Sequence, residues 1–166
     1  MGESTARLGL PLLAAGQAQK ELWHNEALAL VDLALCAGVK ALGAEAPPAA
    51  PEPGELWVLG AAPEGDWAGH PHHLAGWTGG GWRFVAPFEG LSVWVVAEKL
   101  HAMHMGGRWV SGEVRARRVT VDGVPVLGPQ GPAIPLPAGG ATVDDEARQS
   151  LGQVIAALRA HGLIAP

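Results

Sequence analysis

Two glycine turns, each followed by a tryptophan strand, constrain the middle of this chain most strongly. Residues 73–85 alternate apolar and small side chains around a turn at 78–80, and residues 101–110 do the same around 106–107. Such alternation on both sides of a short glycine turn is typical of β-hairpins. A tryptophan follows each turn at the matching place, Trp82 and Trp109. The middle of the chain is therefore predicted to be antiparallel β structure with a weak internal repeat.

Further strands extend this prediction on both sides. Short apolar runs at 56–59 and 91–96 are predicted as strands. Residues 118–127 form a third hairpin signal around Asp122-Gly123, and Pro125 makes its second strand an edge strand. We therefore expect a small Trp- and Gly-rich β domain over residues 55–128.

The N-terminal part, residues 1–42, is predicted to be an extended segment followed by a helix from Gln17 to about residue 42. Asn25 either caps a second helix or lies inside one longer helix. The apolar positions are too widely spread for one face, so we expect an interface helix that also contacts a neighbouring subunit. The expected contact residues are apolar and lie on more than one side of the helix: Leu22, Leu28, Leu30, Val31 and Leu35, with Leu33 and Val39.

Residues 43–54 contain four prolines and are predicted to be a stiff linker. Such a linker would let the preceding helix reach away from the β domain.

Residues 129–166 are predicted to be an extended segment and a C-terminal helix. Thr142 is the expected N-cap, with acidic residues 144–146 in the first turn. The apolar residues follow a four-three-four spacing: Ala147, Leu151, Val154 and Leu158. This spacing suits a short bundle of parallel helices, although an amphipathic helix docked on its own domain fits equally well. Leu151, Val154 and Leu158 are candidate interface residues.

The composition favours self-association. Hydrophobic residues make up 48% and charged residues 16%, and ordinary proteins carry about 25% charged residues. Surplus apolar surface is most simply buried in subunit contacts, so we expect a homo-oligomer, a trimer or pentamer. The net charge of -5 argues against nucleic-acid binding. The densest basic cluster, Arg115, Arg117 and Arg118, is expected to be a solvated strand edge.

No apolar run approaches the roughly 18 residues of a membrane span, and the first residues lack the pattern of a signal peptide. Synthesis and assembly are therefore expected in the cytoplasm, with no membrane partner. Cys36 is the single cysteine, which excludes an intrachain disulfide and suggests a small buried apolar residue.

Seven tryptophans and no tyrosine leave two interpretations open. Buried tryptophans would anchor a small β core, whereas exposed ones could stack on sugar rings. The candidates for sugar binding lie beside glycine-rich turns: Trp67, Trp77 and Trp109.

Neither metal binding nor catalysis is predicted. The histidines lack cysteine partners and a zinc motif, so surface turns explain them best: His70, His72, His73, His101 and His104. Asp66 and Glu89 could be nominated as glycosidase carboxylates, but no pattern selects them. The chain contains no phosphate-binding or dinucleotide-binding motif, so we expect no cofactor and no enzymatic activity.

Motifs in the N-terminal half resemble a known family. The resemblance rests on four segments: Arg7-Leu8-Gly9-Leu10-Pro11, residues 14–20, His24-Asn25-Glu26-Ala27-Leu28 and Gly65-Asp66-Trp67-Ala68-Gly69. They are similar to an uncharacterised domain family found in prophage and gene-transfer-agent clusters of bacteria. The resemblance implies a component of a phage-like particle, such as a head spike base or a spike or tail fibre subunit. It also implies contacts with other particle proteins and attachment to cell-surface polysaccharide.

We therefore expect an α+β chain: an N-terminal helix, a Pro-rich linker, a small antiparallel β domain and a C-terminal helix. The expected function is structural, within a phage-like particle. A lectin-like adhesin that recognises capsular polysaccharide through exposed tryptophans is the alternative, and the two roles can coexist.

Overall fold

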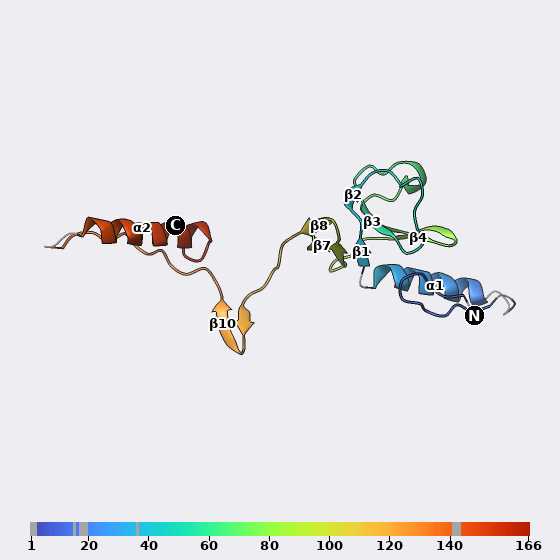
Figure 1. Ribbon diagram of the computed structural model, residues 1–166, viewed down its shortest axis with the longest axis horizontal. Helices are drawn as coiled ribbons and strands as arrows, with labels where there is room; N and C mark the ends of the chain where they lie inside the picture. Colours follow the sequence, from blue (N-terminus) through green and yellow to red (C-terminus); the bar gives the residue numbers. More distant parts are fainter. Residues whose placement is uncertain (1–2, 15, 17–19, 36, 141–143) are drawn as a thin grey trace. The chain divides into compact units, whose positions relative to one another are not determined.

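The computed structural model describes residues 3–14, 16, 20–35, 37–140 and 144–166 (Figure 1). The chain divides into two compact units, Met1–Glu113 and Val114–Pro166, called unit 1 and unit 2 below. Helices at both ends and mostly antiparallel sheets between them confirm the predicted α+β class. The boundary between the units follows neither the predicted linker at 43–54 nor the predicted border at 128.

The N-terminal helix, α1, spans Lys20–Ala34 and is shorter than predicted. The expectation of helix to about residue 42 is wrong, because β1 (Ala37–Val39) and β2 (Leu42–Ala44) occupy that stretch. Val39 is β-branched and fully buried, and Gly43 adopts a positive φ of 79°, which disfavours helix. Pairing with distant strands therefore outweighs the helical spacing. Gln17 and Cys36 lie outside the described residues.

The first sheet of unit 1 has the strand order β2-β3-β4-β5. Its other members are β3 (Leu56–Leu59), β4 (Leu74–Thr78) and β5 (Gly81–Val85), and β4 and β5 form the predicted hairpin at 73–85. β2 joins β3 in parallel. A short 3-10 helix, η1 (Gly65–Trp67), lies in the connection from β3 to β4.

The second sheet has the order β1-β6-β7-β8. β6 spans Ser92–Val95, β7 spans Leu100–Met105 and β8 spans Arg108–Ser111, which confirms the predicted hairpin at 101–110. β1 joins β6 in parallel. Because β1 and β2 are consecutive in the chain but belong to different sheets, residues 37–44 connect the two sheets.

Unit 1 has two clusters of buried apolar residues. The larger one draws Leu33 of α1 together with both sheets, and it contains Val39, Leu56, Val58, Leu74, Val93 and Val95. The second cluster is aromatic and contains Trp57, Leu59, Trp67 and Ala75. A fully buried Val or Leu side chain contributes roughly 1.5–3 kcal/mol. The larger cluster therefore holds α1 and both sheets in one unit, and the aromatic cluster packs η1 against the first sheet.

The proline-rich segment is part of this unit. Residues 42–44 form β2, and the Glu45 carboxylate accepts a hydrogen bond from the Ala62 backbone N at 3.0 Å. The idea that this segment lets the helix reach away from the β domain is wrong, since Leu33 of α1 packs against Gly76 in β4.

Unit 2 holds the third predicted hairpin, β9 (Val119–Val121) and β10 (Val124–Leu127), and the helix α2 (Asp145–Ala160). The N-cap of α2 is Asp144, whose carboxylate accepts from the Ala147 backbone N at 2.8 Å. Thr142, the expected cap, lies outside the described residues. Among the described residues of unit 2, only Ile155 and Ile164 are buried.

Candidate functional site

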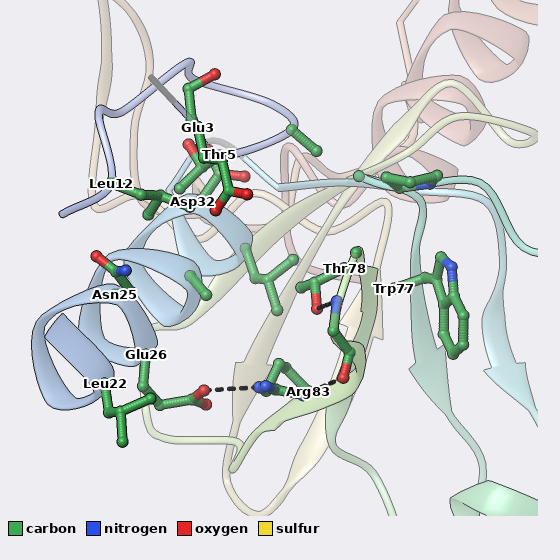
Figure 2. Close-up of a pocket in the computed structure, with 18 residues that line it drawn as sticks. Glu3, Thr5, Leu12, Leu22, Asn25, Glu26, Asp32, Trp77, Thr78 and Arg83 are labelled. Carbon is green, nitrogen blue, oxygen red and sulfur yellow. Dashed lines mark hydrogen bonds and ion pairs between the residues drawn. The ribbon is translucent and has the colours of Figure 1, made fainter. Parts of the chain in front are cut away.

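A groove of about 870 Å³ in unit 1 lies between the N-terminal segment, α1 and the β4–β5 hairpin (Figure 2). Most of its polar side chains are engaged within the chain. Glu26 on α1 accepts a charged hydrogen bond from Arg83 Nε on β5 at 2.8 Å. Asn25 exchanges two hydrogen bonds with the backbone of Leu13, at 2.9 and 3.0 Å.

Asp32 is the most deeply buried acid described and closes one end of this groove. Its carboxylate accepts from Thr5 Oγ1 at 2.8 Å, from the Leu8 backbone N at 2.7 Å and from the Arg7 backbone N at 3.1 Å. A buried carboxylate requires such partners. The residues around the groove therefore hold the N-terminal segment, α1 and the sheet together, and Glu26, Arg83 and Asp32 serve this structural role.

The tryptophans expected to bind sugars are mostly structural. Trp67 has an exposed fraction of 0%, so its ring cannot stack on a sugar and its nomination is wrong. Trp77 is half-buried and packs edge-on against Trp82, with ring centroids 5.0 Å apart. Trp109 is half-buried, and its Nε1 donates to the backbone oxygen of His72 at 2.9 Å.

Two other tryptophans face solvent. Trp23 on α1 is 82% exposed, and Trp94 on β6 is 39% exposed. Trp94 lies edge-on to His101 of β7, with ring centroids 4.8 Å apart, and Gly38 of β1 is its other neighbour across the sheet. Trp94 thus stands on an open sheet face.

The expected interface residues of α1 divide by helical position. Leu22, Val31 and Leu35 are exposed, whereas Leu28 and Leu30 are half-buried. In unit 2, Leu151 and Val154 are exposed and Leu158 is half-buried. Both helices therefore present apolar side chains that the described chain does not cover.

The histidines have packing roles. His70 stacks on Phe84 with ring centroids 3.8 Å apart, and His73 Nδ1 lies 2.9 Å from the Pro71 backbone oxygen. His101 is exposed and His104 is buried, as strand alternation predicts for residues three apart. Among the described residues, no three His, Cys, Asp or Glu side chains are grouped to hold a metal ion.

The segment from α1 to β8 carries the family signal. A family model described as a protein of unknown function, DUF2793, matches residues 24–110. The chain belongs to this family. The DUF2793 match starts within α1 and ends within β8, so it covers both sheets of unit 1 and stops before unit 2. No curated protein matches the chain. Within the described part of this DUF2793 chain, no helix is long and apolar enough to cross a membrane.

Sequence reasoning missed Trp23 and Trp94, although both had local signals. Trp23 lies four residues before Ala27 and eight before Val31, which places all three on one helix face. Trp94 lies between Val93 and Val95, whose burial turns Trp94 to the opposite face of the sheet. Asp32 was also missed, since a single acid in an apolar helix gives no sign of its distant partners.

Proposed function

We propose that this chain is a structural subunit of a phage-like particle, of the gene-transfer-agent or prophage type. In this proposal it forms the base of a head spike, or part of a spike or fibre, and supports attachment to the host surface. It is made in the cytoplasm and then assembled into the particle. The observation that carries the proposal is the uncovered apolar face of α1.

The two faces of α1 differ sharply. On the inner face, Leu33 is buried against the sheet, and Glu26 pairs with Arg83. On the outer face, Trp23 and Val31 are exposed, with the exposed Ala27 between them. These three residues form what we call the α1 stripe.

An exposed apolar stripe with a tryptophan at its end is typical of a protein–protein contact. The low content of charged residues also supports burial of further surface in an assembly. The particle context comes from the resemblance of residues 7–28 and 65–69 to domains of prophage and gene-transfer-agent clusters. The proposed occupant of the α1 stripe is a neighbouring particle protein.

The test replaces Val31 with aspartate in the producing strain. Val31 is a better position than Leu30, because Leu30 is half-buried and its substitution would also disturb unit 1. Ala49→Asp is the matched control, since it adds the same charge on an exposed loop of unit 1. We expect Val31→Asp to remove the chain from purified particles and Ala49→Asp to leave it there. Normal incorporation of a folded Val31→Asp chain contradicts the proposal.

We also propose that the chain acts by binding and has no activity on polysaccharide. Of the two nominated carboxylates, Glu89 accepts a hydrogen bond from the Gly106 backbone N at 2.9 Å and so supports the β7–β8 turn. Release of reducing ends from purified capsule, lost in Asp66→Asn or Glu89→Gln, would contradict this part.

Trp94 favours a second candidate function, a carbohydrate-binding adhesin. An exposed indole face can stack on a sugar ring, and His101 beside it can donate a hydrogen bond. We expect Trp94→Ala to abolish any binding on an array of capsular polysaccharides. Trp23→Ala serves as the control, because it removes another exposed tryptophan from a different element. Equal loss in both variants, or no binding by the unaltered chain, counts against the adhesin.

A further inference from the structure

The helix α2 has two apolar faces, and its own chain covers one of them. The preceding segment, residues 131–140, lies along this face and is called the strap. Arg159 Nη2 donates to the Ile134 backbone oxygen at 3.0 Å, and Arg148 donates to the backbone oxygens of Pro137 and Gly139. Ile155 on this face is buried. The strap therefore covers this side of α2 within unit 2 and accepts hydrogen bonds from both of its arginines.

The second face of α2 remains uncovered. It carries Ala147, Leu151, Val154 and Leu158, which we call the α2 seam. Leu151 is 51% exposed and Val154 is 55% exposed. The four-three-four spacing repeats every 3.5 residues, the period at which one helix packs along another in a coiled coil.

The charges of α2 leave this seam neutral. Both arginines of the helix bind strap carbonyls, and the Asp144 carboxylate caps the first turn. The exposed acids Asp145 and Glu146 lie outside the seam positions. A symmetric contact places each residue near its own copies, so a charged seam would repel itself. The neutral α2 seam is electrostatically self-compatible, and a second copy of this chain can therefore occupy it.

The residue types on the seam indicate how many copies meet. Read as a heptad repeat, leucines 151 and 158 take the a positions, and Ala147 and Val154 take the d positions. Leucine at a with a β-branched residue at d shifts a parallel coiled coil from two strands towards three or four.

The hairpin β9–β10 also has an exposed apolar face, which supports self-association independently of α2. Val121 lies opposite Val124, and Val119 lies opposite Leu127, so these four side chains share one face. All four are exposed. An isolated two-stranded hairpin is marginally stable in water at best, and this one has an aliphatic face to bury.

We propose that unit 2 is a self-association module that forms a parallel homotrimer. The α2 seams of three copies meet at a threefold axis, and the exposed aliphatic face of β9–β10 offers each copy further apolar surface to bury on association. This inference goes beyond the proposed function, because it concerns the purified chain and holds whether or not the chain is incorporated into a particle.

The experiment measures the mass of the full-length chain by light scattering at micromolar concentration. We expect about three times the 17.1 kDa of one chain for the unaltered protein and 17.1 kDa for the double variant Leu151→Asp, Val154→Asp. Gln153→Asp is the matched control, since it adds a charge to an exposed position of α2 outside the seam, and it should remain trimeric. A monomeric, dimeric or pentameric unaltered chain overturns the proposal, as does a double variant of unchanged mass.

Two further measurements keep the result interpretable. All seven tryptophans lie in unit 1, so tryptophan fluorescence reports the folding of unit 1 alone and should be the same in every variant. A Val154→Cys change in a Cys36→Ser chain should form a disulfide between copies under mild oxidation, because identical residues meet at the same level of a parallel seam. Absence of this disulfide, or equal crosslinking by Gln153→Cys, contradicts the parallel arrangement.

Discussion

Unit 1 and unit 2 use the same kinds of apolar side chain with opposite results. In unit 1, the valines of β1, β3 and β6 are buried together with leucines from α1 and β4. In unit 2, the valines of β9 and β10 are exposed, and burial is limited to Ile155 and Ile164 among the described residues. The difference lies in topology: unit 1 packs a helix and two four-stranded sheets around one core, whereas the described residues of unit 2 form a hairpin, a helix with its strap and a bridge between Gly131 and Ile164. Apolar content alone therefore does not make a core, because a core requires layers that face each other.

The largest expected contrast between the units is in proteolysis of their junction. Arg115, Arg117 and Arg118 are exposed just after the end of unit 1. Backbone that is exposed opens for proteases at almost no free-energy cost, whereas a core strand opens only near the global unfolding free energy. We expect trypsin to cut this junction on the order of a hundredfold faster than any site within residues 20–113. Mass spectrometry of the fragments checks this, and early cleavage at Arg83 would erase the contrast.

Trp67 and Trp23 sharpen the comparison within unit 1. Replacing fully buried Trp67 with alanine leaves a cavity, and we expect it to lower the free energy of unfolding by about 3–5 kcal/mol. Trp23→Ala, at the exposed α1 stripe, should change it by less than about 0.5 kcal/mol. Urea denaturation followed by tryptophan fluorescence measures both. Similar costs for the two variants would mean that the exposed stripe is part of the core.

Replacing Asp32 tests whether the N-terminal segment contributes to the free energy of unfolding of unit 1. Asp32→Ala leaves the Leu8 backbone N and Thr5 Oγ1 without their acceptor, so we expect a loss of about 1–3 kcal/mol. Asp66→Ala is the control, because Asp66 is exposed. Urea denaturation followed by tryptophan fluorescence measures both variants. A cost no larger than that of the control would show that residues 3–14 contribute nothing to the stability of unit 1.

The smallest expected effect concerns the ion pair between Lys40 Nζ and Glu55 Oε1, 2.6 Å apart, in which the lysine is exposed and the glutamate is half-buried. The hydrogen bond from Lys40 lowers the pKa of Glu55, and the same bond raises the pKa of Lys40. A lowered carboxylate pKa stabilises the fold above the ordinary pKa of glutamate, and this stabilisation is lost as the pH falls through the lowered value. A raised lysine pKa stabilises the fold below the ordinary pKa of lysine, and this stabilisation is lost as the pH rises through the raised value.

The pair therefore stabilises the fold at neutral pH. We expect Glu55→Gln to lower the Tm of unit 1 by about 1 °C at pH 7 and by less at pH 3, because solvent screens exposed charges. Glu64→Gln, on an exposed carboxylate, is the control for thermal melts at both pH values. A large loss at pH 7 would mean that the pair is not screened as its exposure implies.

The hairpins and α2 were predictable from the sequence because their partners are local. Glycine turns with alternating flanks determine β4–β5, β7–β8 and β9–β10, and an acidic first turn followed by regular apolar spacing determines α2. β1 was not predictable, because it pairs in parallel with the distant strand β6. β2 was not predictable, because it has only three residues and joins the next strand, β3, in parallel across the proline-rich segment. The apolar spacing of residues 37–42 thus predicted a helix, whereas the structure has the strands β1 and β2 there.

The candidate sites were predictable only in part, for the same reason. Helical spacing predicted Val31, Leu151 and Val154 as interface residues. All three are exposed, and their place in an interface stays a prediction. Burial of Trp67 could not be read in this way, since it depends on Trp57 and Trp82 from two other strands. Glycine neighbours were therefore a poor guide to which tryptophans are exposed.

The parallel pairing of β1 with β6 has a consequence for the order of events during synthesis. Ala37 leaves the ribosome long before Val93, its partner in the sheet. Until then β1 lacks its partner strand, although β3 and β4, which pack with Leu33 of α1, have already emerged. Chains dominated by such distant pairings fold slowly and expose apolar segments while they wait. In the nascent chain, β1 is thus the strand of unit 1 that waits longest for its partner.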